Sequence, residues 1–181
     1  MEDKQKGRNM WSRIIQACWM MGWAILAAHA GEVPKPPVIL EYINPEKFTD
    51  VSSTYHGPPN QSYLDQFSKH VMKKAAAYLA DGEQLNIAVK DIDMAGGFEP
   101  WNTPSHDVRM IRHIYPPRIE LNYQLKDAEG KVLDEGEVQL GDLNYQLRAV
   151  MNSSDAMRYE KSLMDDWLMQ MFVDRAAGKN D

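Results

Sequence analysis

Cysteine is almost absent from this sequence, because Cys18 is the only one among 181 residues. It lies in an apolar run near the N-terminus, and removal of that run would leave a chain without disulfide, thiol nucleophile or cysteine-bound zinc. An exported protein that has no cysteine is indifferent to an oxidising compartment. The absence therefore favours a bacterial periplasm over the class of small, disulfide-linked secreted domains.

Long apolar runs are equally scarce, and residues 14–28 form the run that bears on export. Basic residues precede this run, and Ala28 and Ala30 stand at the small-residue positions of a signal-peptidase site, a combination typical of a secretory signal peptide. As a helix the run reaches roughly 22 Å, short of the roughly 30 Å hydrocarbon core. We therefore predict cleavage after Ala30, in preference to an uncleaved anchor or a lipidated Cys18. The predicted location is the periplasm, with no membrane span after cleavage.

Basic charge is in deficit over the rest of the chain. The leader carries 4 basic and 2 acidic residues, which leaves 16 basic and 24 acidic residues and a net charge of −8 for residues 31–181. Such a domain repels nucleic acid and anionic lipid at long range. No basic stripe with interleaved aromatic residues is present, so nucleic-acid binding is excluded.

The usual catalytic motifs are also missing. The four histidines outside the leader form no metal-binding pair of the H-x-x-x-H or H-E-x-x-H type, and no G-x-S-x-G nucleophile turn is present. His70 is expected to be a partly covered surface residue, and Glu160 and Asp165 to lie on a solvated helix face. We predict no cofactor and no metal. The histidines concerned are His56, His70, His106 and His113.

Residues 31–181, the chain without its leader, are long enough to form one domain without covalent cross-links, since 151 residues bury about 70% of their unfolded surface. We predict a proline-rich linker at 31–37, a single domain at 38–173 and a frayed tail at 174–181. Helical periodicity begins at Asn60, with Gly82 placed to end that helix, and a second helix follows the capping residues 153–155. Alternating apolar residues predict strands at 38–43, 83–94, 119–125 and 132–140, with a short further strand at 109–114. The expected class is α+β, a mostly antiparallel sheet with two amphipathic helices packed on one face as a two-layer sandwich.

The segment DIDMAGGFEPW, residues 91–101, raises the main chemical question. Residues two apart share a strand face, so Asp91 and Asp93 are expected on the core face of Ile87 and Val89, where unpaired carboxylates are costly. A cation, arginine side chains, backbone amides of the Gly96 turn, or a bulge would relieve that cost. We favour arginines, with Asp91 and Asp93 forming ion pairs. The candidate partners are Arg109, Arg112 and Arg118.

A calcium loop is a weaker interpretation of the same segment. Asp91, Asp93 and Gly96 occupy the first, third and sixth positions of a twelve-residue loop. Ala95 stands at the fifth position and Asn102 at the twelfth, where the bidentate glutamate is required. A high-affinity site is not expected.

Five segments in order resemble a known family: FTDV, DIDMAGGFEPW, DVRMIRHIYPPRIEL, GDLNY and SSDAMRYEKSLMDDWL. Together they resemble the Domain of Unknown Function 3016 family of exported proteobacterial proteins, over about residues 38–172. The resemblance implies a periplasmic protein. It implies no reaction and supplies no catalytic residues.

The function expected from these observations is a non-enzymatic binding or assembly module of the cell envelope. A contact patch is predicted at Phe98, Glu99, Trp101 and Tyr115, with an envelope protein or a small ligand as partner. The alternative is a metal-dependent hydrolase that uses Asp91, Asp93 and Glu99. A small-ligand carrier, with a pocket between the sheet and the helices, is a third possibility.

Overall fold

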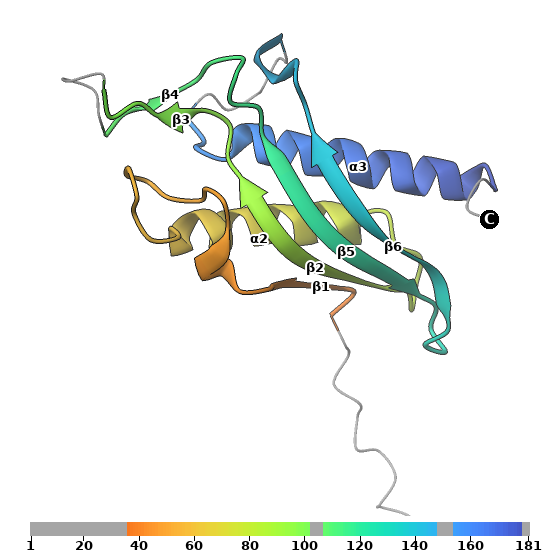
Figure 1. Ribbon diagram of the computed structural model, residues 1–181. Coiled ribbons are helices and arrows are strands. Elements are labelled where there is room, and N and C mark those ends of the chain that lie inside the picture. The colour runs from red at the N-terminus through yellow and green to blue at the C-terminus, as the bar shows by residue number, and fades with distance from the viewer. Residues whose placement is uncertain (1–35, 102–106, 148–153, 179–181) are drawn as a thin grey trace, which may run out of the picture. The chain divides into compact units, whose positions relative to one another are not determined.

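A four-stranded sheet carries two helices on one of its faces in the computed structural model (Figure 1). The structure describes residues 36–101, 107–147 and 154–178, so the predicted leader and most of the linker lie outside the described residues. The strands lie in the order β1-β2-β5-β6. Their bounds are Val38–Tyr42 for β1, Gln84–Asp93 for β2, Arg118–Lys126 for β5 and Val132–Gly141 for β6.

Strand direction follows from the connections. The α2 helix, Gln61–Ala76, links β1 to β2, and a crossover of this length allows the two strands to run parallel, as they do. The β2–β5 and β5–β6 pairs are antiparallel. Gly130, with φ +84°, makes the predicted hairpin turn between β5 and β6. The sheet is therefore mostly antiparallel, and the predicted α+β class is confirmed.

The α2 helix begins as the sequence predicts and ends earlier. Asn60 caps it by accepting a hydrogen bond from the Tyr63 backbone N–H at 3.3 Å. The helix stops at Ala76, and residues 77–82 form turns that lead into β2. Gly82, with φ +84°, lies in the last of these turns, so it redirects the chain rather than ending the helix.

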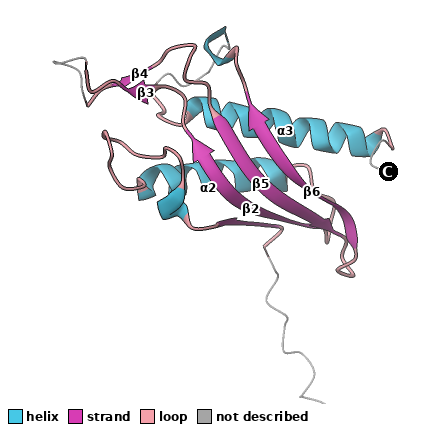
Figure 2. Ribbon diagram, in the orientation of Figure 1, coloured by secondary structure: helices cyan, strands magenta, loops and turns pink. Residues whose placement is uncertain are grey.

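The α3 helix, Arg158–Ala176, supplies the rest of the covering layer (Figure 2). It starts three residues after Asp155, whose carboxylate accepts hydrogen bonds from the Met157 backbone N–H at 2.9 Å and the Lys161 ammonium at 2.6 Å. Its apolar side packs with that of α2 against the sheet. The residues buried at this interface include Phe67, Val71, Ile87, Val89, Leu121, Met164 and Leu168. The helix runs three residues past the predicted end of the domain.

Two short elements complete the end of the sheet where β2 stops. Strands β3, Gly97–Phe98, and β4, Arg109–Met110, pair with each other, so the predicted strand at 109–114 is shorter than expected. Two 3₁₀ turns, η1 at Pro45–Lys47 and η2 at Tyr145–Leu147, lie in loops. We call this region, with the loops between β1 and α2 and between β4 and β5, the loop end. None of the helices in the described part of the chain has the length and apolarity that crossing a membrane requires.

Candidate functional site

A bulge in β2 decides where the paired aspartates point. The pairing of β2 with β5 shifts register between Val89 and Asp91, so Lys90 is an additional residue on the exposed side. Val89 and Ile92 are therefore the buried residues, each 0% exposed. An inserted residue moves every later side chain of a strand to the opposite face. Asp91 and Asp93 consequently leave the core face on which strict alternation had placed them.

Asp91 is held by a threonine and not by an arginine. Its two carboxylate oxygens accept hydrogen bonds from the Thr49 backbone N–H and the Thr49 hydroxyl, both at 2.6 Å. Asp93 stands opposite Arg118 in the β2–β5 register. Burial, and then the neighbouring Asp50 carboxylate, raise the pKa of Asp93 above its ordinary value. The expectation that these two aspartates form the arginine fork is therefore wrong for Asp91. For Asp93, Arg118 stands opposite in the register, and its positive charge lowers the pKa of Asp93 against the larger effect of burial.

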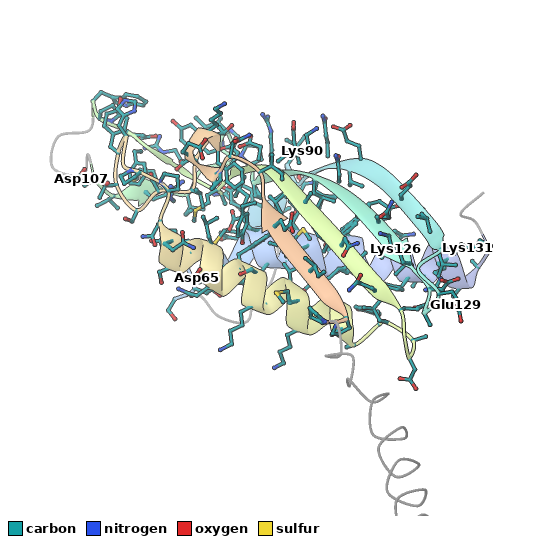
Figure 3. All side chains as sticks on the ribbon, turned by 90° about the horizontal axis from the view of Figure 1, so that it is seen from below. Asp65, Lys90, Asp107, Lys126, Glu129 and Lys131 are labelled. Carbon is teal, nitrogen blue, oxygen red and sulfur yellow. The ribbon has the colours of Figure 1, made fainter. Side chains whose placement is uncertain are left out.

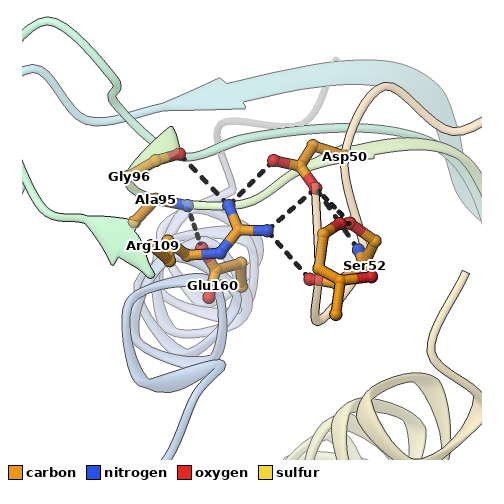
Figure 4. Close-up of polar contacts among 7 residues, drawn as sticks. Asp50, Ser52, Ala95, Gly96, Arg109 and Glu160 are labelled. Atoms are coloured by element: carbon orange, nitrogen blue, oxygen red, sulfur yellow. Dashed lines mark hydrogen bonds and ion pairs between the residues drawn. The ribbon is translucent and has the colours of Figure 1, made fainter. Parts of the chain in front are cut away.

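The arginine fork exists with a different acid, Asp50 (Figure 4). Both terminal nitrogens of Arg109 donate to the Asp50 carboxylate, each at 2.8 Å. They also donate to the backbone oxygens of Gly96 at 3.2 Å and Ser52 at 2.9 Å. The guanidinium stands 4.6 Å above the centre of the Phe98 ring. Arg109 thus ties the β1–α2 loop to the β2–β3 turn.

Sequence reasoning missed Asp50 because nothing in its spacing distinguishes it from other polar loop residues. Asp50 reaches β2 through a single parallel bridge to Asp93. That contact joins residues 43 positions apart along the chain, so no local pattern encodes it. An Asp–Arg fork is present, but its acid is Asp50, which the sequence analysis did not name.

A second ion pair involves Glu99, which belongs to the predicted contact patch. Its side chain is 3% exposed and pairs with Arg112 at 2.9 Å, and the Tyr115 hydroxyl lies 3.5 Å from the other oxygen. Arg112 itself is 48% exposed. The buried Glu99 therefore positions the half-exposed Arg112 through this ion pair. Trp101, by contrast, is 72% exposed and lies on the surface.

Glu160 is the most unusual charged group of the loop end. The prediction of a solvated position was wrong, because the first turn of α3 passes beneath the β2–β3 turn and leaves Glu160 0% exposed. One carboxylate oxygen accepts the Ala95 backbone N–H at 2.7 Å, and the other has no hydrogen-bond partner in the described structure. Burial raises the pKa of Glu160 to about 7, because a charged carboxylate is poorly solvated there.

His70 is partly covered, as predicted, with its side chain 29% exposed, and it also has a partner on the other helix. Its Nε2 lies 2.8 Å from a carboxylate oxygen of Asp165, and that oxygen belongs to α3, 95 residues away. The contact joins the two helices. Among the other histidines, His56 packs on the Tyr55 ring with centroids 4.0 Å apart, and His106 lies outside the described residues.

The hydrolase alternative requires Asp91, Asp93 and Glu99 to meet at one centre. Asp91 is engaged by Thr49 and Glu99 by Arg112. Across residues 36–101, 107–147 and 154–178, no three histidine, cysteine or acidic side chains gather as metal ligands. Asp91 and Glu99 therefore serve separate contacts and do not share one centre.

Large apolar side chains that are exposed to solvent gather at the loop end. We call them the apolar patch; their exposed fractions run from 54% to 86%. Three segments carry them and are joined by hydrogen bonds: Tyr145 donates to the Arg112 carbonyl at 2.8 Å, Gln146 to the Ile111 carbonyl at 3.1 Å, and Gly96 to the Tyr115 carbonyl at 3.0 Å. The members are Trp101, Val108, Ile114, Leu143 and Leu147.

Two of the surface hollows in the described part of the chain bear on these features. One of about 380 Å³ lies in the loop end, where Phe48, Asp50, Tyr55 and Phe98 are among its lining residues. The other, of about 580 Å³, lies on the side of the sheet away from the helices, over β1, β2, β5 and β6. The space between the sheet and the helices, where the carrier hypothesis placed a ligand, is instead occupied by the buried core.

Comparison with known proteins bears on the family alone. A family model described as "Protein of unknown function (DUF3016)" matches residues 36–170. No match was found among the curated proteins. Among solved structures, the crystal structure of a minor lipoprotein from Acinetobacter baumannii is similar at 10% identity over 80% of this chain and 95% of that chain, with a TM-score of 0.30. A score that low supports no argument about fold or function. The family match spans most of the chain and confirms the resemblance found in the sequence motifs: the protein is a member of the DUF3016 family.

Proposed function

We propose that this protein is a non-enzymatic binding or assembly module of the cell envelope, exported to the periplasm and matured by cleavage after Ala30. The observation that carries the proposal is the apolar patch. Large apolar side chains that gather exposed at one end of a protein favour an interaction site there. The proposed partner is another envelope protein, which covers the patch.

The composition of the patch supports a protein partner. Trp101 is 72% exposed and Leu147 86% exposed, and Arg112, half exposed, stands among the patch segments on its Glu99 support. Tryptophan and arginine are enriched among the residues that dominate binding energy in protein interfaces. The Asp50–Arg109 and Glu99–Arg112 ion pairs and the Tyr145 hydrogen bond join the segments that carry these residues before any partner arrives. Preorganisation of this kind lowers the entropy lost on binding.

Site-specific photo-crosslinking in cells that produce the full-length precursor tests this proposal. A photoreactive residue at Leu147 or at Trp101 should give a crosslink to the same envelope protein. Val173 on α3 is a matched control, because it is 56% exposed and apolar but lies outside the patch. Equal products from Val173, or no product from either patch position, would contradict a docking role for the patch.

Two further measurements address the remaining parts of the proposal. Intact mass of the periplasmic form should correspond to a chain that begins at Gly31; a mass that retains residues 1–30 or a lipid on Cys18 contradicts the proposed processing. Native mass spectrometry of the same material should show a bound protein. A small molecule retained in its place would favour the small-ligand alternative.

A further inference from the structure

Glu160 joins the first turn of α3 to the end of the sheet, at the point where the patch segments meet. Its carboxylate accepts the Ala95 backbone N–H at 2.7 Å, and Ala95 lies in the β2–β3 turn, which continues through β3 to Trp101. Arg109 of β4 and Tyr145 of η2 lie within electrostatic range of the same carboxyl group. One buried acid therefore faces all three segments.

The surroundings of Glu160 suit a neutral acid and not an anion. The side chain is 0% exposed, and its second carboxyl oxygen has no hydrogen-bond partner in the described structure. Its neighbours along α3 and along the turn include three buried methionines, Met94, Met157 and Met164. A buried charge without partners is costly, and the Ala95 N–H replaces only part of the hydration that an anion loses.

The nearest positive groups are engaged by other partners. Arg109 donates to Asp50 through both terminal nitrogens (Figure 4). Arg158 donates to the Asp155 carbonyl at 3.0 Å. Burial outweighs the favourable effect of these two arginines and raises the pKa of Glu160 to about 7. An ionised Glu160 therefore gains solvation only when the loop end rearranges.

The β2–β3 turn is attached separately to β4 and to α3. The Gly96 backbone N–H donates to the Tyr115 carbonyl at 3.0 Å, and the Gly96 carbonyl accepts from Arg109 at 3.2 Å. These bonds hold the turn to the segment that contains β4. Among the hydrogen bonds of the described chain, the bond from Ala95 to Glu160 joins the turn to α3.

A hollow beside the turn gives water a route to this contact. It has a volume of about 200 Å³, and Met94, Arg109 and Arg158 are among its lining residues. Space of this size admits several water molecules. A small separation of the turn from α3 is therefore enough to hydrate the carboxylate.

We propose that Glu160 is a pH-dependent latch of the loop end: as a neutral acid it holds the β2–β3 turn against α3, and once ionised it releases Ala95 and turns towards water. The released turn moves Trp101 with it and so alters the apolar patch. The effect on a partner rests on the proposed function. The latch is a property of the protein without a partner, so the two proposals can fail separately.

Amide hydrogen exchange in protein purified from the periplasm tests the latch. Corrected for the intrinsic effect of pH, the exchange rates give the opening equilibrium of each amide. Opening at Ala95 should increase at least tenfold from pH 5 to pH 8, because it lets an acid with a raised pKa ionise. At pH 8 it should exceed opening at Leu121 at least tenfold, since Leu121 lies on β5 between two strands. Equal opening of the two amides would mean that Ala95 exchanges through global unfolding, and would refute the latch.

Two variants identify the group that controls the opening. Glu160→Gln stays neutral and keeps an acceptor oxygen, so opening at Ala95 should change less than twofold between the two pH values. Glu129→Gln is the matched control, because it is the same substitution in the exposed β5–β6 turn, at the end of the sheet away from Asp107 (Figure 3); it should behave as the parent. If Glu160→Gln retains the increase of the parent, another group drives the opening and the proposal is wrong.

The carbon-13 signal of the Glu160 carboxyl group provides a measurement that needs no variant. Its titration midpoint should lie near pH 7, and the amide signal of Ala95 should shift over the same range. A midpoint below about pH 5 would mean that Glu160 is ionised while the loop end is closed, which overturns the proposal.

Discussion

The loop end and the open face of the sheet use the same charged residue types in opposite ways. At the loop end, Arg109 and Asp50 are 15% and 22% exposed and share a two-pronged contact. On the open face, Lys90 and Glu137 form a single contact at 36% and 57% exposure. Breaking a buried pair leaves an unsolvated charge, whereas water replaces a lost surface partner. The comparison indicates that the loop-end pair holds separate segments in place, whereas the open-face pair is a surface contact that adds little to stability.

Removal of Arg109 should have the largest effect. Arg109→Ala leaves Asp50 and the Gly96 and Ser52 carbonyl groups without their shared donor. We expect the free energy of unfolding to fall by about 3–5 kcal/mol, measured by urea denaturation. A loss below about 1 kcal/mol would mean that the buried and surface pairs are energetically alike and would remove the basis of the comparison.

Glu160 should make stability depend on pH. Its folded pKa of about 7 exceeds that of the unfolded chain, so the folded state binds more protons between these two values. Stability therefore decreases as the pH rises from about 4.5 to about 7, by about 3 kcal/mol for this group, and changes little above that range.

Glu160→Gln removes this titration and tests it. The variant should be more stable than the parent at pH 8 and should lose most of that advantage at pH 4.5, as measured by denaturation at both values. The groups that face Glu160 are the Ala95 backbone N–H and, at longer range, Arg109 and Arg158. A difference between variant and parent that is constant across this range would show that Glu160 is ionised throughout.

Asp91→Asn should have a smaller effect. Asp91 is partly exposed, and in the described part of the chain its carboxylate accepts hydrogen bonds from Thr49 only. An asparagine at this position retains one of the two acceptor oxygens. We expect a loss of about 1 kcal/mol, unaffected by chelator or by added calcium in a thermal melt. Stabilisation by calcium that the variant abolishes would restore the metal interpretation.

Lys90→Ala should have the smallest effect, close to the limit of measurement, because water replaces the lost surface partner. Its contact with Glu137 lies on the exposed side of the β2 bulge, and salt screens such a pair. Denaturation in low and high salt should show that the small difference from the parent shrinks further in high salt. A loss comparable to that of Arg109→Ala would erase the contrast between the two regions.

Much of the fold was accessible from periodicity. Alternation identified the strands around Ile87 and Leu121, and the three-and-four spacing of Phe67 and Val71 identified the first helix. Each of these signals arises within one element, because its residues face a common core. The β2 bulge escaped the same reasoning, because strict alternation takes Lys90 and Asp91 as ordinary successive positions.

The site was less accessible because its contacts join distant segments. The pairs Asp50–Arg109, Ala95–Glu160 and Tyr145–Arg112 connect residues 59, 65 and 33 positions apart. Arg109 and Arg112 were identified as ion-pair residues from the sequence, but their acids were assigned by proximity along the chain. Glu160 had the appearance of an ordinary charged helix position.

By itself, the sequence determined the class of fold, the elements that face the core and the family, since apolar spacing and ordered motifs are local properties of a chain. Tertiary structure alone decided which carboxylate meets which arginine, which glutamate is buried and which apolar side chains stay exposed. Those outcomes depend on how separate segments pack at the end of the sheet. The free energy of a charged group depends on its burial, and a side chain becomes buried only when these segments pack together.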